Sequence, residues 1–189
     1  SNSSDPHDPY LRAWGSGGTD TAAGSGDMEQ YSYSYLRFDV SKVPAGKLSS
    51  AKLMLTHISG PSFTLEAAKQ NPLIVRPISA DFTEKTWDFG QVDRIAPEPG
   101  PKAIFGKGAP ESLPAADKEF VISIDLMKGP KDFSSYLDKS IKSPTRALGL
   151  SLTTTLEVNG PDGRTFYKVY SKDCETALKR PVLRLSIDN

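Results

Sequence analysis

Short segments of alternating apolar and polar residues recur along most of the chain. In residues 31–40 (YSYSYLRFDV) every second residue from position 36 onward is apolar, and residues 51–57 (AKLMLTH) repeat the pattern. A period of two predicts strands with one buried face. The residues that this pattern assigns to the core are Leu36, Phe38, Val40, Ala51, Leu53 and Leu55. Further strands are predicted at residues 11–14, 119–126, 147–155, 165–171 and 181–187.

The segments between these strands contain little helical pattern. Residues 133–141 are the one helix that the pattern predicts. Residues 63–67 and 72–77 are predicted to form a hairpin, because the second segment is apolar and β-branched. Residues 80–90 indicate a turn or a single helical turn. Residues 95–116 hold five prolines and three glycines, which predicts a long surface loop without regular structure.

These elements predict an all-β fold. Eight or nine short strands with turn residues between them are typical of an antiparallel β-sandwich or barrel, and long crossing loops favour a jelly roll. An immunoglobulin-like Greek key is the alternative topology, although the chain lacks the Cys–Trp–Cys spacing of antibody domains. A length of 189 residues fits one domain, so residues 1–189 are interpreted as a single β-sandwich domain.

Charge is balanced over the whole chain but not along it. The 23 Lys and Arg residues equal the 23 Asp and Glu residues, which argues against a general nucleic-acid binder. Residues 1–40 nevertheless carry a net charge of −4, and residues 164–184 carry +4. The two segments either neutralise each other across a sheet or leave a basic groove that attracts uronate. No apolar stretch approaches the ~20 residues of a membrane span, and the single Cys174 excludes an intrachain disulfide.

Several longer blocks of sequence occur together in one order. They are YSYLRFDVSKVP (33–44), SSAKLMLTHIS (49–59), ISADFTEKTWDFG (78–90), ALGLSLTTT (147–155) and FYKVYSKDCETALKRPVLRLSID (166–188). Together these blocks resemble the DNRLRE-type domain, which is also classified as carbohydrate-binding module family 96. DPYLRAWG (8–15) is similar to the opening strand of that family, and Trp87 matches a family tryptophan. Residues 91–118 are longer and richer in proline than the family pattern.

The resemblance implies a jelly-roll β-sandwich that is secreted or displayed at the cell surface. Its implied function is non-catalytic binding of a polysaccharide, with acidic glycans such as alginate as the implied ligand class. Such a module targets an attached polysaccharide-active enzyme to its substrate. We expect the isolated domain to be a monomer that requires no cofactor and has no nucleic-acid partner.

Aromatic and cationic residues alternate on two of the predicted strands. Opposite the core face of residues 31–40 stand tyrosines, which stack on sugar rings, and Arg37, whose planar guanidinium suits a carboxylate. By the family register, Val169 and Ser171 face inward, so Phe166, Lys168, Tyr170 and Lys172 point outward. The resemblance also places Arg12 beside this second set. The candidate ligand-binding residues are Arg12, Tyr33, Tyr35, Arg37, Lys168, Tyr170 and Lys172. Both sets also fit solvated strand faces, with Arg37 pairing with Asp39 or with an acidic residue on a neighbouring strand.

Few residues offer catalytic chemistry, and we expect no catalytic residue. His7 lies near the start of the sequence, and His57 ends a predicted strand, where a structural role is the simpler interpretation. Cys174 has no histidine near it in the sequence. Residues 167–172 (YKVYSK) are similar to one strand of jelly-roll polysaccharide lyases, but the arginine-rich and histidine-containing strands of those enzymes are missing. Such a lyase and an adhesive or structural sandwich are the alternatives to a binding module.

Acidic residues in the glycine-rich first part of the chain suit a structural Ca²⁺, because hard oxygen ligands on loops bind this ion. The residues concerned are Asp5, Asp8, Asp20, Asp27 and Glu29. They do not have the spacing of an EF-hand loop, and acidic loops without a metal are commoner. Calcium therefore stays an open hypothesis without an assigned ligand set. The sequence leaves open which glycan is bound, and whether it is bound at a chain end or internally.

Overall fold

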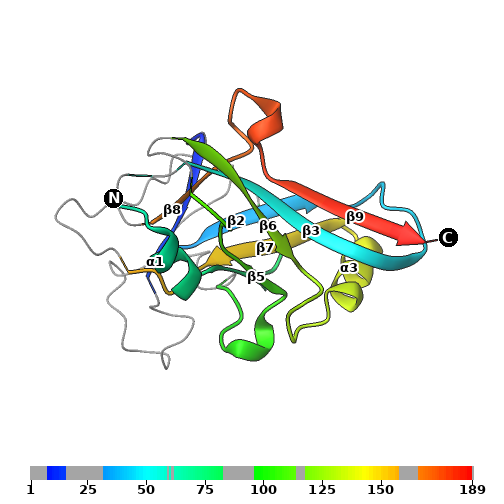
Figure 1. The fold of residues 1–189 in the computed structure, drawn as a ribbon. Coiled ribbons are helices and arrows are strands. Elements are labelled where there is room, and N and C mark those ends of the chain that lie inside the picture. Colours follow the sequence, from blue (N-terminus) through cyan, green and yellow to red (C-terminus); the bar gives the residue numbers. More distant parts are fainter. Residues whose placement is uncertain are drawn as a thin grey trace.

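Two antiparallel sheets pack face to face in the described part of the chain (Figure 1). The computed structural model describes residues 8–15, 32–58, 60, 62–82, 96–113, 118–157 and 166–188. The five-stranded sheet consists of β1 (Tyr10–Ala13), β8 (Tyr167–Tyr170), β3 (Lys47–Ile58), β6 (Glu119–Asp125) and β9 (Val182–Asp188). The four-stranded sheet consists of β2 (Ser34–Asp39), β7 (Ala147–Thr153), β4 (Leu73–Pro77) and β5 (Gly106–Gly108). The expected all-β sandwich is confirmed, and the jelly-roll topology stays a prediction.

The core lies between the two sheets and follows the alternation in the sequence. Ala51, Leu53 and Leu55 on β3 are fully buried, as predicted, and Leu36 and Val40 are buried where the second sheet meets them. The remaining predicted core residue of that strand, at position 38, is partly buried against the same cluster. The alternation in the sequence therefore predicted the inward-facing residues of both sheets correctly, because side chains alternate between the two faces of a sheet.

The predicted hairpin at residues 63–67 and 72–77 is wrong. A short helix, α1 (Leu65–Gln70), occupies the first segment, and the Thr64 side chain caps it by accepting a hydrogen bond from the Ala67 N–H at 3.2 Å. An N-cap threonine followed by small helix-forming residues favours this turn over a strand. The second segment forms β4, which pairs with β5 and β7 instead. The predicted helix is confirmed as α3 (Phe133–Lys142), capped by Asp132.

The proline-rich segment at residues 95–116 is more ordered than its composition predicts. Its described part contains the 3₁₀ turn η3 (Pro101–Ala103) and the edge strand β5, and the Phe105 side chain between them is fully buried. An edge strand of three residues, two of them glycine, tolerates flanking prolines because one of its sides needs no hydrogen-bond partner. This segment therefore completes the four-stranded sheet. Residues 83–90 of the predicted turn at 80–90 lie outside the described residues.

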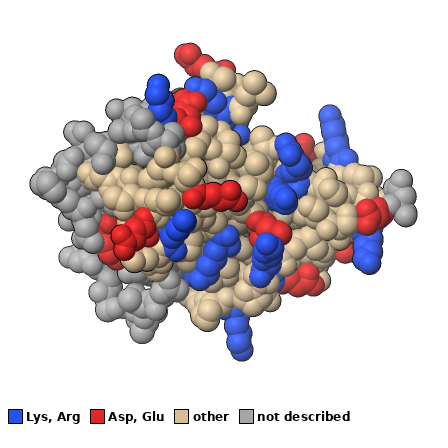
Figure 2. Space-filling model, in the orientation of Figure 1, with Lys and Arg blue, Asp and Glu red and all other residues tan. Residues whose placement is uncertain are grey.

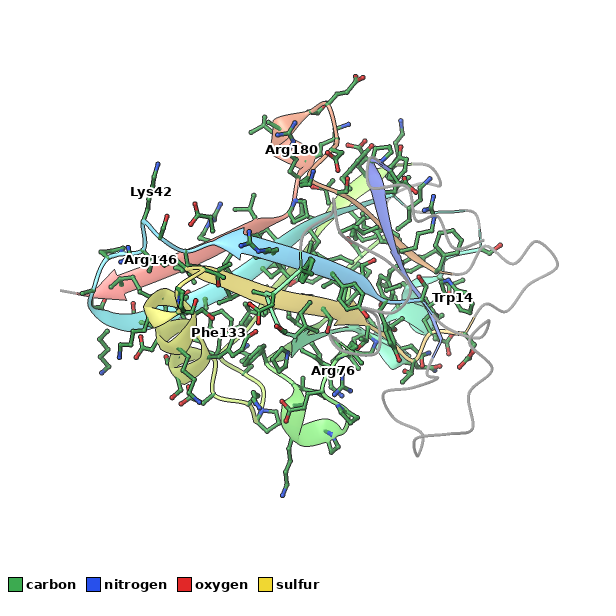
Figure 3. All side chains as sticks on the ribbon, turned by 180° about the vertical axis from the view of Figure 1, so that it is seen from behind. Trp14, Lys42, Arg76, Phe133, Arg146 and Arg180 are labelled. Carbon is green, nitrogen blue, oxygen red and sulfur yellow. The ribbon has the colours of Figure 1, made fainter. Side chains whose placement is uncertain are left out.

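A fully buried arginine holds this segment against the outer face of the four-stranded sheet. Arg76, on β4, donates from Nη1 to the backbone carbonyls of Glu98 at 3.2 Å and Gly100 at 2.6 Å, and from Nε to Thr153 Oγ1 at 3.3 Å. Figure 3 shows Arg76 beside the turn that contains η3. Nearby, residues 78–79 cross Gly149 so closely that a Cβ there would lie 2.7 Å from the Ile78 carbonyl oxygen. The outer face of this sheet is therefore partly covered by chain.

We expect the substitution Arg76→Met to lower the free energy of unfolding by about 3 kcal/mol, because it leaves buried carbonyls without their charged donor. Urea denaturation measures this loss. The matched control is Arg37→Met, since Arg37 is exposed and donates one hydrogen bond, to the Ala80 carbonyl. The control is expected to change stability by less than about 0.5 kcal/mol. Equal losses in the two variants would contradict the structural role of Arg76.

Candidate functional site

Residues from β1 and β8 meet on the outer face of the five-stranded sheet. The register of this antiparallel pair sets Tyr10 opposite Tyr170 and Arg12 opposite Lys168. Directly opposite residues of paired strands project to the same face. Tyr167 and Val169 alternate with them and lie in the core. Lys168 and Tyr170 therefore project from the outer face, where Lys168 is partly exposed and Tyr170 is buried by its neighbours, with 8% of it exposed. Three of the seven predicted ligand-binding residues, Arg12, Lys168 and Tyr170, therefore lie together, as the resemblance implied.

The side chains on this face form a row of rings and cations. The rings of Tyr10 and Tyr170 lie 5.2 Å apart between centroids, and the Lys168 Nζ is 3.9 Å from the centroid of the Tyr10 ring. The Lys179 Nζ, from the 3₁₀ turn η4 (Ala177–Lys179), is 5.1 Å from the centroid of the Tyr170 ring. Ammonium groups at these distances are attracted by the ring electrons. We call Tyr10, Arg12, Lys168, Tyr170 and Lys179 the aromatic–cation cluster.

Two carboxylates position the cluster. Asp8 accepts a hydrogen bond from Arg12 Nη1 at 2.6 Å. Glu119, at the start of β6, accepts from Lys179 Nζ at 2.6 Å and from the Tyr170 hydroxyl at 2.5 Å. These bonds, from Lys179 first and Tyr170 second, lower the pKa of Glu119, and the bond to Glu119 raises the pKa of Tyr170. Glu119 is therefore a carboxylate and Tyr170 a protonated phenol at neutral pH.

The other predicted residues lie elsewhere. Tyr35 and Arg37 project from β2, in the four-stranded sheet, and Tyr33 directly precedes that strand. The Tyr35 ring packs on Phe82, with ring centroids 6.3 Å apart, so the chain that crosses this sheet covers it in part. Lys172 follows β8 and forms an ion pair with Asp173 at 2.8 Å. The structure therefore separates the β2 residues from the aromatic–cation cluster, because the two sets belong to different layers of the sandwich.

Sequence patterns missed two members of the cluster, Tyr10 and Lys179, and the carboxylate of Glu119 that positions it. Tyr10 stands two residues before Arg12, so the same alternation that selected Arg12 contained the signal for it. Glu119 and Lys179 carry no comparable signal. Glu119 begins a strand and Lys179 lies in a turn 60 residues later, so the two meet only when the sheet has formed.

Figure 2 shows acidic and basic side chains interspersed over the face of β3, β6 and β9, without one large basic patch.

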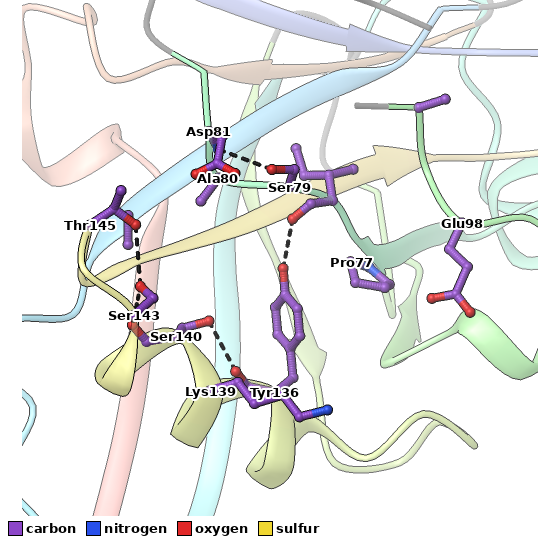
Figure 4. Close-up of a pocket in the computed structure, with 13 residues that line it drawn as sticks. Pro77, Ser79, Ala80, Asp81, Glu98, Tyr136, Lys139, Ser140, Ser143 and Thr145 are labelled. Atoms are coloured by element: carbon purple, nitrogen blue, oxygen red, sulfur yellow. Dashed lines mark hydrogen bonds between the residues drawn. The ribbon is translucent and has the colours of Figure 1, made fainter. Parts of the chain in front are cut away.

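An open groove of about 440 Å³ lies between α3 and the segment that follows β4 (Figure 4). Tyr136, on α3, reaches across its floor, and its hydroxyl lies 2.7 Å from the Ile78 carbonyl oxygen and 2.8 Å from that of Gly149. Burial raises the pKa of Tyr136 to about 12. Lys139 and Ser143 also line the groove. None of the predicted ligand-binding residues lines it, and its hydroxyls bond mainly to backbone within the protein.

Within the described residues, no group of three or more His, Cys, Asp and Glu side chains is arranged to hold a metal ion. Asp8 binds Arg12 instead. The other acidic residues considered for Ca²⁺ lie outside the described residues: Asp5, Asp20, Asp27 and Glu29. The calcium hypothesis therefore stays open.

His57 lies inside a cage of aromatic rings and is fully buried. Its ring centroid is 4.5 Å from that of Phe63, 4.7 Å from that of Phe120 and 5.7 Å from that of Tyr167. Burial lowers the pKa of His57 to about 3, against the opposing effect of the Phe166 backbone. The imidazole is therefore neutral at physiological pH and out of reach of a substrate. His7 lies outside the described residues.

No family model matches the chain, and no curated protein matches it significantly. Among the described residues, no helix has both the length and the apolar character that crossing a membrane requires.

The buried imidazole makes stability depend on pH. Because the pKa of His57 is about 3 in the folded state and ~6.5 in an unfolded chain, the unfolded state binds a proton first as the pH falls. The titration of His57 therefore leaves the free energy of unfolding unchanged above the pKa of the unfolded state. Below that pKa it lowers the free energy of unfolding by about 1.4 kcal/mol per pH unit. We expect His57→Phe to remove this slope between about pH 6.5 and pH 5, a window above the titration of most carboxylates.

Urea denaturation at a series of pH values measures the slope. His7→Gln is the matched control, because the chain has two histidines, and this variant is expected to keep the slope of the parent. The same slope in His57→Phe as in the parent protein would contradict the assignment.

Proposed function

We propose that the chain is a non-catalytic carbohydrate-binding module that recognises an acidic polysaccharide on the outer face of its five-stranded sheet. The observation that carries the proposal is the aromatic–cation cluster, in which the partly exposed Tyr10 ring packs on the buried Tyr170 ring and Arg12, Lys168 and Lys179 lie beside this pair. Flat rings stack on the faces of sugar rings, and cations bind their carboxylates. The resemblance of the sequence to carbohydrate-binding module family 96 supports the same function.

The contacts within the cluster suit a binding surface. Lys168 lies over the Tyr10 ring, and among the described contacts only this cation–π contact holds it there. Its flexible side chain can therefore turn toward a sugar carboxylate, which frees the Tyr10 ring to stack on the sugar. Arg12 keeps its orientation through Asp8, and about a third of its side chain is exposed. A uronate residue would thus meet a stacking ring with a guanidinium and an ammonium beside it.

Two properties of the site favour binding over proton abstraction. A lyase base must lose its proton readily, whereas the bond to Glu119 raises the pKa of Tyr170. His57 is neutral but fully buried among aromatic rings, away from any substrate. We therefore place the chain among targeting modules, secreted or at the cell surface, that bring an attached polysaccharide-active enzyme to its substrate.

We expect Lys168→Ala and Tyr10→Ala each to weaken alginate binding about tenfold, which corresponds to the loss of one charged or stacking contact of about 1.4 kcal/mol. Isothermal titration calorimetry with alginate oligosaccharides measures the change, and added salt is expected to weaken binding by the parent. Arg37→Ala is the matched control, because it removes an exposed cation from the other sheet and is expected to bind as the parent does.

Three outcomes would count against the proposal. Absence of binding to alginate, pectate and neutral glucans would overturn the function itself. Loss of binding in Arg37→Ala but not in Lys168→Ala would move the site to the β2 face. The appearance of an unsaturated product in the ultraviolet spectrum on incubation with alginate would favour a lyase.

A further inference from the structure

One edge of the five-stranded sheet has no partner strand in the described part of the chain. β9 pairs with β3 on one side, and no pairing on its other side occurs among the described residues. β9 lies near the margin of the ribbon in Figure 1, where the connection from β2 to β3 is drawn beside its C-terminal end. Its inward residues Leu183, Leu185 and Ile187 are half-buried, whereas Ala51, Leu53 and Leu55 of β3 are fully buried.

The backbone of β9 shows which of its polar groups face this open edge. The Ser186 carbonyl points to β3, because it accepts a hydrogen bond from Ser49 Oγ at 3.2 Å. Ala51, the partner of Leu185, directs its carbonyl away from β9, to the Leu126 N–H at 2.9 Å. Backbone groups alternate in direction along a strand. Leu185 and its second neighbours on either side therefore present their N–H and C=O groups at the open edge.

The side chains of β9 are complementary to a second, antiparallel copy of the same strand. A two-fold axis at Ser186 sets Leu185 opposite Ile187 of the partner subunit, a pair whose backbone groups both face the new partner. The same register sets Arg184 opposite Asp188 of the partner subunit on the outer face. Apolar residues meet on the inner face and opposite charges on the outer one, and a two-fold axis produces each pair twice.

Among the described residues of a single chain, Arg184 has no such partner. Its neighbour across the sheet is Lys52, which has the same charge, and none of the ion pairs between described residues includes Arg184. Like charges directly opposite each other destabilise a sheet. Shifting the axis to Leu185 would set Arg184 opposite Ser186 of the partner subunit, which leaves the charges unpaired. The charges therefore select one register.

We propose that a second copy of this chain adds to the open edge through antiparallel β9–β9 pairing centred on Ser186. The two five-stranded sheets then form one continuous sheet, in the manner of strand addition at exposed edges. This assembly differs from the monomer expected from the sequence, and it does not depend on the proposed carbohydrate binding.

Sedimentation equilibrium of the full chain tests the assembly. The parent is expected to show twice the mass of the chain at high concentration. Arg184→Asp and Asp188→Arg each set like charges opposite each other and are expected to abolish the dimer, whereas the double variant R184D/D188R restores opposite charges and is expected to recover it. The matched control is Lys142→Asp, an exposed cation of α3 that should leave the dimer intact.

A cross-link tests the register. Opposite Ser186 residues form a pair with Cα atoms about 4.5 Å apart, a separation that a disulfide spans. Under mild oxidation Ser186→Cys is expected to give a covalent dimer, whereas Ser123→Cys, exposed on β6, is not. The native Cys174 is buried and does not compete. A parent that stays monomeric at every concentration, or equal cross-linking of the two cysteine variants, would overturn the proposal.

Discussion

A buried guanidinium decides which face of this sandwich is open. A fully buried cation requires acceptors on its donor groups, and Arg76 obtains them from the Glu98 and Gly100 carbonyls and from Thr153. The carbonyls belong to a segment rich in proline. Because proline has no backbone N–H, such a segment pairs poorly as a strand and leaves carbonyl groups available as acceptors. The arginine thereby fixes the segment over the four-stranded sheet. This segment leaves the outer face of the five-stranded sheet uncovered.

The open face is organised by charge pairing rather than by an excess of one charge. Glu119 holds both the Lys179 ammonium and the Tyr170 hydroxyl, and Asp8 holds Arg12. Each carboxylate reduces the entropy that its cation would lose on meeting a ligand, which favours affinity through preorganisation. A chain of zero formal net charge thus holds cations in fixed positions on this face, which the proposed binding of an acidic polysaccharide would use.

Alternation in the sequence predicted most of the fold but not its topology. It identified β2, β3, β6 and β9, because a strand with one buried face has a period of two whatever its neighbours are. β7 was predicted as well, although it is buried on both faces. Alternation failed at β5, where a three-residue edge strand is too short to show a period, and at α1, where capping by Thr64 outweighs the local apolar pattern. For the site, it identified Lys168 and Arg12 as members of one outer face only in combination with the family resemblance. It did not separate these from Arg37, because membership of a sheet depends on pairing between distant strands.

The open edge of β9 has a consequence for binding to long polymers. A two-fold axis that pairs this edge with its copy stands perpendicular to the sheet, so the outer faces of both subunits point to the same side. One polysaccharide chain could then engage both faces, and the second contact would form at a high effective concentration set by their fixed spacing. Weak individual contacts would hold a polymer firmly and still release a short fragment quickly. Such a protein would distinguish an intact polymer from its degradation products by length alone.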